Sequence, residues 1–125
     1  MRRTWWHAVD MAVLEITPDA LRVRLNRLEQ IGGVHGSFLV PWDHIEHARA
    51  ISDLWPHVRG WRMPGTGLPH VILLGRMRYR YGTDFTAMYK NLPGVILELR
   101  DEEFRRLLIS TPIAGDVVRR VTTGA

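Results

Sequence analysis

Hydrophobic and polar residues alternate most regularly in the second half of the chain, between Val71 and Tyr81. A short apolar run there leads into a segment in which arginine takes every second position: Arg76, Met77, Arg78, Tyr79, Arg80 and Tyr81. Alternation with a period of two is typical of a β-strand whose two faces have different surroundings. The pattern predicts a strand with one basic face and one apolar face, and it predicts Phe85 on the apolar side.

Similar alternation along most of the chain predicts a mainly β protein with turns at the Gly, Pro and Asp residues between strands. Strands are expected at 8–16, 21–26, 35–40, 45–51, 71–81, 85–89, 95–99 and 107–109, with one helical turn at 27–31. The hairpin formed by the fifth and sixth of these strands is expected to turn at 82–84. A C-terminal helix is expected over 112–122, because Thr111 can cap it, Pro112 suits its first position and valines recur on one side.

The long connection from Ser52 to Pro69 contains several prolines and glycines and no regular alternation. Loops of this length in compact domains are usually functional or are packed by their own side chains, here Trp55 and Trp61. Many short strands followed by one amphipathic helix predict a barrel or two orthogonal sheets, closed at one end by the helix.

The composition indicates one globular domain without disulfides or thiolate chemistry, since the 125 residues include no cysteine. We expect a single domain over 1–125 with flexible ends at 1–7 and 122–125. The longest strictly aliphatic run, at 71–74, is far shorter than the roughly 20 residues that span a bilayer. Of the 17 basic residues 16 are arginine, and the net charge is +4. This excess reflects either GC-rich coding or an anionic partner.

Four segments carry a family resemblance: LWPHVRGWRMPGTGLPHVILLG at 54–75, GTDFTAMY at 82–89, VILEL at 95–99 and RLLIS at 106–110. Together with the strand order, they resemble an uncharacterised family of bacterial pleckstrin-homology-like proteins. The resemblance implies a bent antiparallel sheet or barrel of about seven strands with a C-terminal capping helix. It implies no activity. The loop at 16–20, where lipid-binding members of the wider fold place bases, has an acid and no base, which argues against headgroup recognition there.

The three arginines of the alternating segment are the sharpest candidates for binding. On one strand, Arg76, Arg78 and Arg80 project to the same side at intervals of about 7 Å, a spacing that suits an acidic surface or a phosphate chain. Arg22 and Arg24 join them if the two strands are neighbours. The alternative is a solvated face whose arginines pair with acids on adjacent strands. The preceding loop adds three further candidate binding residues: Trp61, Arg62 and His70, the last where the family usually has glycine.

A catalytic or metal site has weaker support from the spacing. In a small enzyme, His57 or His70 would act as an acid or base. Asp53 and Asp84 are the carboxylates that could approach these histidines. The segment 43–47, DHIEH, has metal-ligand residue types, but on a strand its two histidines point to opposite faces. We therefore predict no catalytic residue, no metal and no cofactor, with the small enzyme kept as an alternative.

The pattern as a whole favours a non-catalytic binding module. Its expected partner is a protein with an acidic or extended segment, or a second copy of the chain, bound at an open sheet edge. Peripheral binding to an anionic membrane through the arginines and Trp5 or Trp6 is another alternative. Nucleic-acid binding is not favoured, because no base-reading element accompanies the basic face. We expect a cytoplasmic protein, either free or at the membrane surface.

Overall fold

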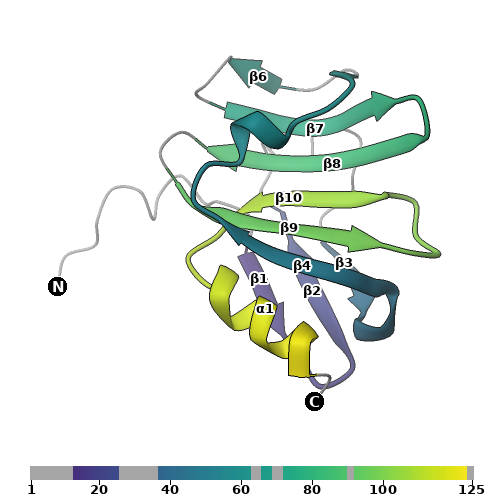
Figure 1. Cartoon of the computed structure of the whole chain (residues 1–125), viewed down its shortest axis with the longest axis vertical. Helices are drawn as coiled ribbons and strands as arrows, with labels where there is room; N and C mark the ends of the chain where they lie inside the picture. The colour runs from purple at the N-terminus through teal and green to yellow at the C-terminus, as the bar shows by residue number, and fades with distance from the viewer. Residues whose placement is uncertain (1–12, 26–36, 63–65, 69–71, 90–91, 124–125) are drawn as a thin grey trace, which may run out of the picture.

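The computed structural model describes residues 13–25, 37–62, 66–68, 72–89 and 92–123. In this part of the chain the strands form two sheets, followed by one α-helix, α1 (Ala114–Thr123) (Figure 1). The predicted mainly β architecture with a C-terminal helix is confirmed. The helical turn predicted at 27–31 and the flexible end predicted at 1–7 lie outside the described residues.

The smaller sheet is an antiparallel meander of three strands. They are β1 (Val13–Ile16), β2 (Ala20–Arg24) and β3 (Ser37–Pro41). The first two are joined by the predicted turn, where both the N–H and the hydroxyl of Thr17 donate to the Ala20 carbonyl. From Leu21 to Arg24 buried and exposed residues alternate, so the two-faced strand predicted there is confirmed.

The larger sheet contains five long strands and two short ones. The long strands are β4 (Ile45–Ile51), β7 (Ile72–Tyr79), β8 (Gly82–Tyr89), β9 (Gly94–Leu99) and β10 (Arg106–Ser110). The short ones are β5 (Trp61–Arg62) and β6 (Thr66–Leu68), and two 3₁₀ helices are η3 (Trp42–His44) and η4 (Trp55–His57). The connection between β4 and β7, predicted as an irregular loop, therefore contains η4, β5 and β6.

Of the two predicted arrangements, a barrel or two orthogonal sheets, the described strands form two sheets and no closed barrel, and the larger sheet is not wholly antiparallel. The order is β4-β9-β10-β8-β7-β5, with β6 also paired to β7, so the described sheet has free ends and does not close. Strand β10 is antiparallel to β9 but parallel to β8. The described residues form ten strands rather than about seven. Hydrophobic alternation indicates which face of a strand is buried but not which strand lies beside it, so it did not predict the parallel pair.

The β7–β8 hairpin turns earlier than predicted. Tyr79 pairs with Gly82, so Arg80 and Tyr81 form a two-residue turn. The residues 82–84, predicted as the turn, are instead the first three of β8. Because the turn comes earlier, Asp84 lies within β8 and not in the turn.

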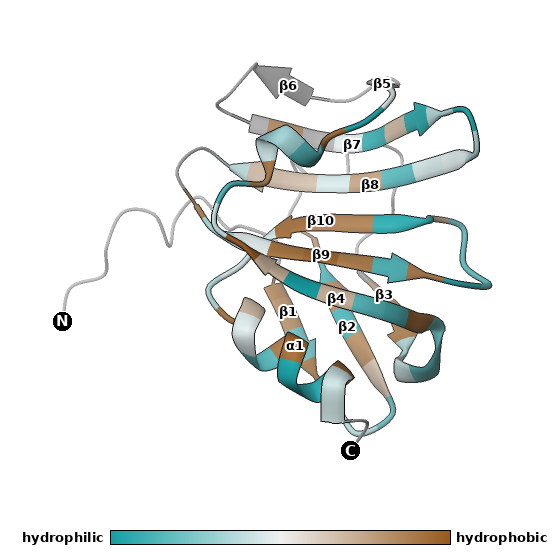
Figure 2. Ribbon diagram, viewed as in Figure 1, coloured by the Kyte–Doolittle hydropathy of each residue, from teal (hydrophilic) through white to brown (hydrophobic). Residues whose placement is uncertain are grey.

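Side chains cover both faces of the larger sheet. Odd-numbered residues of β8, β9 and β10 face the smaller sheet and α1, where they form the main core. Even-numbered residues of the same strands face the opposite way and contribute Met88, Ile96 and Leu108 to a second core. The other buried members of this core are Leu54, Leu73 and Met77. Figure 2 shows β9 and β10 as nearly continuous hydrophobic ribbons. Strands buried on both faces give continuous apolar runs, which explains VILEL and RLLIS.

The segment 52–60 packs on the second core. Leu54 is buried there, and Trp55 and Val58 pack against it. At Gly60 the segment approaches β7 closely: φ is +81°, and a Cβ atom would lie 2.2 Å from the carbonyl oxygen of Arg78. Only glycine accepts both conditions without strain. The packing role predicted for Trp55 is confirmed.

Helix α1 begins slightly later than predicted, at Ala114, and packs on β4 and β9. The hydroxyl of Thr111 accepts a hydrogen bond from the N–H of Ile113 at 3.2 Å. The predicted apolar face is confirmed, because Val117 is buried and its neighbours on that side contact the main core: Ile113, Val118 and Val121. No helix in the described residues is long and apolar enough to cross a membrane.

Candidate functional site

Strand β4 is an edge strand, because among the described strands it pairs only with β9. Hydrogen bonds at the end of β9 show which backbone groups face outward. The N–H of Arg100 donates to the His44 carbonyl at 2.9 Å, whereas the N–H of Leu99 donates toward the β10 side. Backbone groups alternate sides along a strand, so even-numbered residues of β9 bond to β4. Their register partners in β4 are His47 and Arg49.

Ala48 and Ala50 consequently direct their N–H and C=O groups to the open edge. Their side chains are small, and no proline interrupts the strand. Prolines, inward charges and bulges are the devices by which proteins usually protect sheet edges. The bulge in β4 lies at its beginning, between Ile45 and His47. The rest of the strand therefore offers regular backbone groups that pair with no other strand in the described part of the chain.

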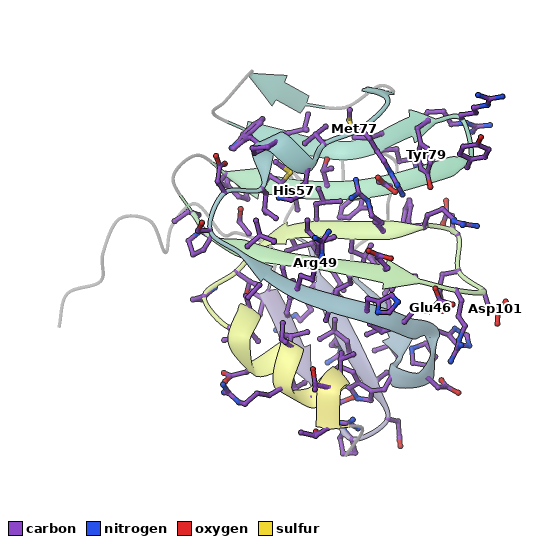
Figure 3. The ribbon with its side chains drawn as sticks, viewed as in Figure 1. Glu46, Arg49, His57, Met77, Tyr79 and Asp101 are labelled. Carbon is purple, nitrogen blue, oxygen red and sulfur yellow. The ribbon has the colours of Figure 1, made fainter. Side chains whose placement is uncertain are left out.

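An open groove of about 580 Å³ runs beside this edge. His47, Arg49 and Glu98 lie on the face that bears the second core, whereas Ala48 packs toward the main core, so the groove passes around the edge of β4. Figure 3 shows Glu46 and Arg49 on this part of the molecule. The last turn of α1 forms the other side. The groove is lined by Glu46, His47, Ala48, Arg49, Glu98, Val121 and Thr122.

A second hollow, of about 390 Å³, adjoins the groove, since Val121 lines both. It lies where η3, the turn after β1 and the end of α1 meet. Its lining residues are Pro18, Asp19, Trp42, Asp43, Arg120 and Val121. Val121, in the last turns of α1, thus separates the groove beside β4 from the hollow at Trp42 and contributes to both.

The arginines of β7 meet three different surroundings instead of forming one basic face. Arg76 donates to Glu103 at 2.9 Å, whereas Arg78 is exposed. Arg80 lies beyond the end of the strand, in the hairpin turn, with its guanidinium 5.4 Å from the centroid of the Tyr81 ring. Arg76 and Arg78 share one side of the strand, as predicted, but Arg80 does not continue their row.

The aromatic residues near β7 also differ from the prediction. Phe85 pairs directly with Arg76, and directly paired residues point to the same face, so Phe85 is not opposite the arginines. It is buried in the main core. Tyr81, predicted to be buried, is 70% exposed. Met77 is buried in the second core, as predicted, and Tyr79 is half-buried.

Arg22 and Arg24 do not join the arginines of β7, because they lie in the smaller sheet. Both bind Glu15 of β1, at 3.4 and 2.9 Å, and these three residues are here called the Glu15 cluster. Hydrogen bonds from Arg24 and Arg22 lower the pKa of Glu15 below its ordinary value. For these two arginines the alternative interpretation, a solvated face paired with an acid on an adjacent strand, is confirmed.

Trp61 and Arg62 form β5, whose backbone pairs with Arg78 and Met77 of β7. Their backbone therefore lies beside the arginines, but their side chains are outside the described part of the structure. Three other candidate residues lie wholly outside the described ranges: Trp5, Trp6 and His70.

The histidine and carboxylates of the alternative acid–base site are not hydrogen-bonded to one another. His57 lies on η4 and contributes its backbone carbonyl, which accepts from Arg106 at 2.8 Å. Asp53 accepts from the N–H of Trp55 at 3.2 Å. Asp84 is bound by arginines. The described residues thus offer no histidine–carboxylate pair around His57.

Three charged residues, of which the sequence analysis considered only Asp84, connect the segment 52–60 to the larger sheet. We call Asp84, Arg59 and Arg106 the Asp84 cluster. Arg59 binds both carboxylate oxygens, with Nε 2.8 Å from Oδ2 and Nη2 3.1 Å from Oδ1. Arg106 binds Oδ2 through Nε at 3.0 Å. Arg59 also stacks 3.8 Å from the centroid of the Tyr79 ring, and its Nη2 donates to the hydroxyl of Tyr79.

The contacts of the Asp84 cluster are structural. Arg106 extends from the sheet to the carbonyl of His57, and Arg59 extends from the segment back to the sheet. The sequence contained one signal, since Arg106 and Asp84 are the single charges in the apolar runs RLLIS and GTDFTAMY. These runs pair in parallel with the two residues in register, which the sequence pattern did not indicate.

The side chains of segment 43–47 diverge, partly because it is divided between η3 and β4. His44 Nδ1 lies 2.6 Å from Glu102 Oε2, and this hydrogen bond raises the pKa of His44 above its ordinary value of 6.5. His47 instead pairs in register with Glu98. Within the described ranges, no three His, Cys, Asp or Glu side chains are close enough to hold a metal ion.

Comparison of the chain with protein-family models, with curated proteins and with solved structures gives no significant match. The candidate site is therefore defined by the geometry of this chain. It consists of the open edge of β4, the groove beside it and the adjoining hollow at Trp42.

Proposed function

We propose that this domain is a non-catalytic binding module that accepts an extended segment of a partner protein as an additional strand on β4. The observation that carries the proposal is the open edge of β4, where the outward N–H and C=O groups of Ala48 and Ala50 meet no neighbouring strand among those described and Ala48 lines the groove. In strand addition, main-chain hydrogen bonds supply affinity, and pockets for alternate side chains supply specificity.

The two sides of the groove suit different side chains of such a segment. Toward α1, Ala48 and Val121 offer an apolar surface. On the other side, His47, Arg49 and Glu98 offer charges and hydrogen bonds of both signs. Successive side chains of an added strand point to opposite sides. The expected segment therefore alternates apolar residues, directed to α1, with polar or charged ones.

The proposal retains the predicted class of function but uses a different surface. Arg76 is engaged by Glu103 and Arg80 lies in a turn, so the binding face is assigned to β4 instead of β7. An edge strand beside a C-terminal helix also supports the resemblance to pleckstrin-homology-like proteins. The parallel pairing of β8 with β10 is a departure from the arrangement that the resemblance implies.

Amide exchange tests the mode of binding directly. Short peptides selected from a displayed random library on the folded protein serve as probes. Bound peptide should slow the exchange of the Ala48 and Ala50 amides and leave His47 and Arg49 unchanged, because the latter already bond to β9. Slowed exchange at neither Ala48 nor Ala50 in any peptide complex would overturn the proposal.

A proline variant supplies the matching affinity test. Ala48→Pro removes an outward N–H, and proline is tolerated in edge strands at such positions. It should weaken peptide binding at least about tenfold, whereas Ala48→Val, which adds similar bulk but keeps the N–H, should bind far more tightly than the proline variant. Equal affinities of the two variants would contradict strand addition. The exchange pattern of the wild type decides the question should the proline variant not fold.

A further inference from the structure

The hollow before β4 is built around one face of Trp42. The indole N–H donates to the Thr17 carbonyl at 2.8 Å, which fixes the orientation of the ring. Arg120 of α1 lies over that ring, with its guanidinium carbon 4.5 Å from the centroid. A cation at this distance from an indole face is attracted by the ring. The hollow therefore already holds a cationic group, which the protein itself supplies.

Two carboxylates line the same hollow without forming an ion pair inside the described part of the chain. Asp19 and Asp43 are both exposed there. Arg120 donates to the carbonyl of Pro18 at 3.2 Å and not to either carboxylate. Arg100 contacts Asp43 through the backbone carbonyl. With two carboxylates and one guanidinium, the lining of the hollow carries one negative charge in excess, in a protein whose net charge is +4.

We infer that this hollow receives a basic side chain, arginine or lysine, of the partner segment bound on β4, and that Arg120 covers the ring of Trp42 until the segment displaces it. An aromatic face flanked by carboxylates recognises such a side chain by cation–π attraction and by charge-assisted hydrogen bonds. The inference rests on the proposed strand addition and specifies the chemistry of the segment.

The position of the hollow also specifies where the basic residue occurs in the partner. Trp42 precedes β4, and Val121 lines both hollows, so a segment on β4 continues into the hollow beyond the beginning of the strand. Antiparallel pairing is the commoner arrangement, and in it the added segment runs toward its own C-terminus at this end. The basic residue therefore follows the residues that pair with Ala48 and Ala50.

The test uses peptides selected on the wild-type protein, and affinity is measured by fluorescence anisotropy at low salt. Replacing the C-terminal basic residue of a peptide by alanine should weaken binding about tenfold, and so should the double variant Asp19→Asn/Asp43→Asn. Arg120→Ala should instead strengthen binding several-fold, because it frees the ring and removes a competing charge. Arg119→Ala is the matched control, since Arg119 is paired with Asp116 and is not part of the lining. This control should leave the affinity unchanged.

The outcomes separate this inference from the proposed function. Suppose that Ala48→Pro abolishes binding while the Asp19, Asp43 and Arg120 variants bind like the wild type. Strand addition would then stand, and the basic-residue inference would be wrong. Weaker binding by Arg120→Ala would also overturn it, because Arg120 would then contact the partner. If Ala48→Pro and the acid variants all leave affinity unchanged, both proposals fail.

Discussion

Two carboxylates in this protein each bind two arginines, and their surroundings are opposite. The side chain of Asp84 is 1% exposed, whereas that of Glu15 is 33% exposed. The arginines of the Asp84 cluster come from segment 52–60 and from β10, so the cluster connects two distant parts of the chain. Both arginines of the Glu15 cluster come from β2, the neighbour of β1 in a hairpin.

The same set of charged groups therefore has different consequences in the two places. In the Asp84 cluster the carboxylate and Arg106 are buried, so water cannot take the place of Asp84, and its removal leaves an uncompensated charge in the interior. In the exposed cluster water and salt take the place of a missing partner at little cost. Burial and the separation of the connected segments, more than the number of ion pairs, decide which cluster holds the fold together.

The largest effect is expected from the centre of the buried cluster. Asp84→Asn removes the charge that compensates Arg59 and Arg106 and should lower the free energy of unfolding by about 3 kcal/mol or more. Urea denaturation of wild type and variant measures this loss. The comparison would fail if the loss were no larger than that of Glu15→Gln under the same conditions.

A smaller and more local effect is expected from Arg59, whose side chain is 39% exposed. Arg59→Met should lower the free energy of unfolding by about 1–2 kcal/mol, because charge-assisted hydrogen bonds are lost while Arg106 still compensates Asp84. The amides of His57 and Val58, which bond within η4, should exchange faster as the segment loosens. Arg78→Met, which alters an exposed arginine on the adjacent strand, is the control and should leave both quantities unchanged.

The His44–Glu102 pair is intermediate in burial between the two clusters, with side chains that are 30% and 24% exposed. Its contribution to the free energy of unfolding depends on pH. Because Glu102 raises the pKa of His44 in the folded state, the stabilisation is complete below the ordinary value of 6.5 and is lost as the pH rises through the raised value. Glu102→Gln should reduce this dependence, because Glu102 is the main cause of the raised pKa and Asp43 and Asp101 add to it. Unfolding free energies of both proteins, compared across neutral pH, measure it. Identical pH profiles would contradict the assignment.

The smallest effect is expected from Glu15→Gln. The two arginines lower the pKa of Glu15, so its contribution is present above the ordinary value of 4.5 and is lost as the pH falls through the lowered value. The contribution should be slight near neutral pH and should disappear in high salt, because all three side chains reach solvent. A loss of stability that persists in 1 M salt (a Debye length of about 3 Å) would remove the distinction between the clusters.

The sequence predicted those strands and turns that can be recognised from a few consecutive residues. The bounds predicted for β4 agree with the structure, and the turn after β1 does as well. Strands β5 and β6 have only two and three residues, too few for alternation to be detected. The row of arginines is shorter than predicted because Arg80 lies in a two-residue turn, whereas Gly82, Thr83 and Asp84, which have typical turn residue types, pair within the β7–β8 hairpin.

The candidate site was less predictable because it depends on pairing between distant segments. The outward direction of the backbone at Ala48 follows from the register between β4 and β9, about 50 residues apart in the chain. The hollow at Trp42 combines a turn, a 3₁₀ helix and the last helix. The sequence led us to expect an open sheet edge, but it did not indicate which strand provides it.

Strand β10 has a consequence for the order of events during synthesis. It is the only described strand that joins the β4–β9 pair to the β8–β7 pair, and all five of its residues are buried. A nascent chain that has reached residue 99 contains both pairs but not the strand between them. The larger sheet can therefore form only after residues 106–110 have left the ribosome, and until then the apolar edges of β8 and β9 are available to other chains.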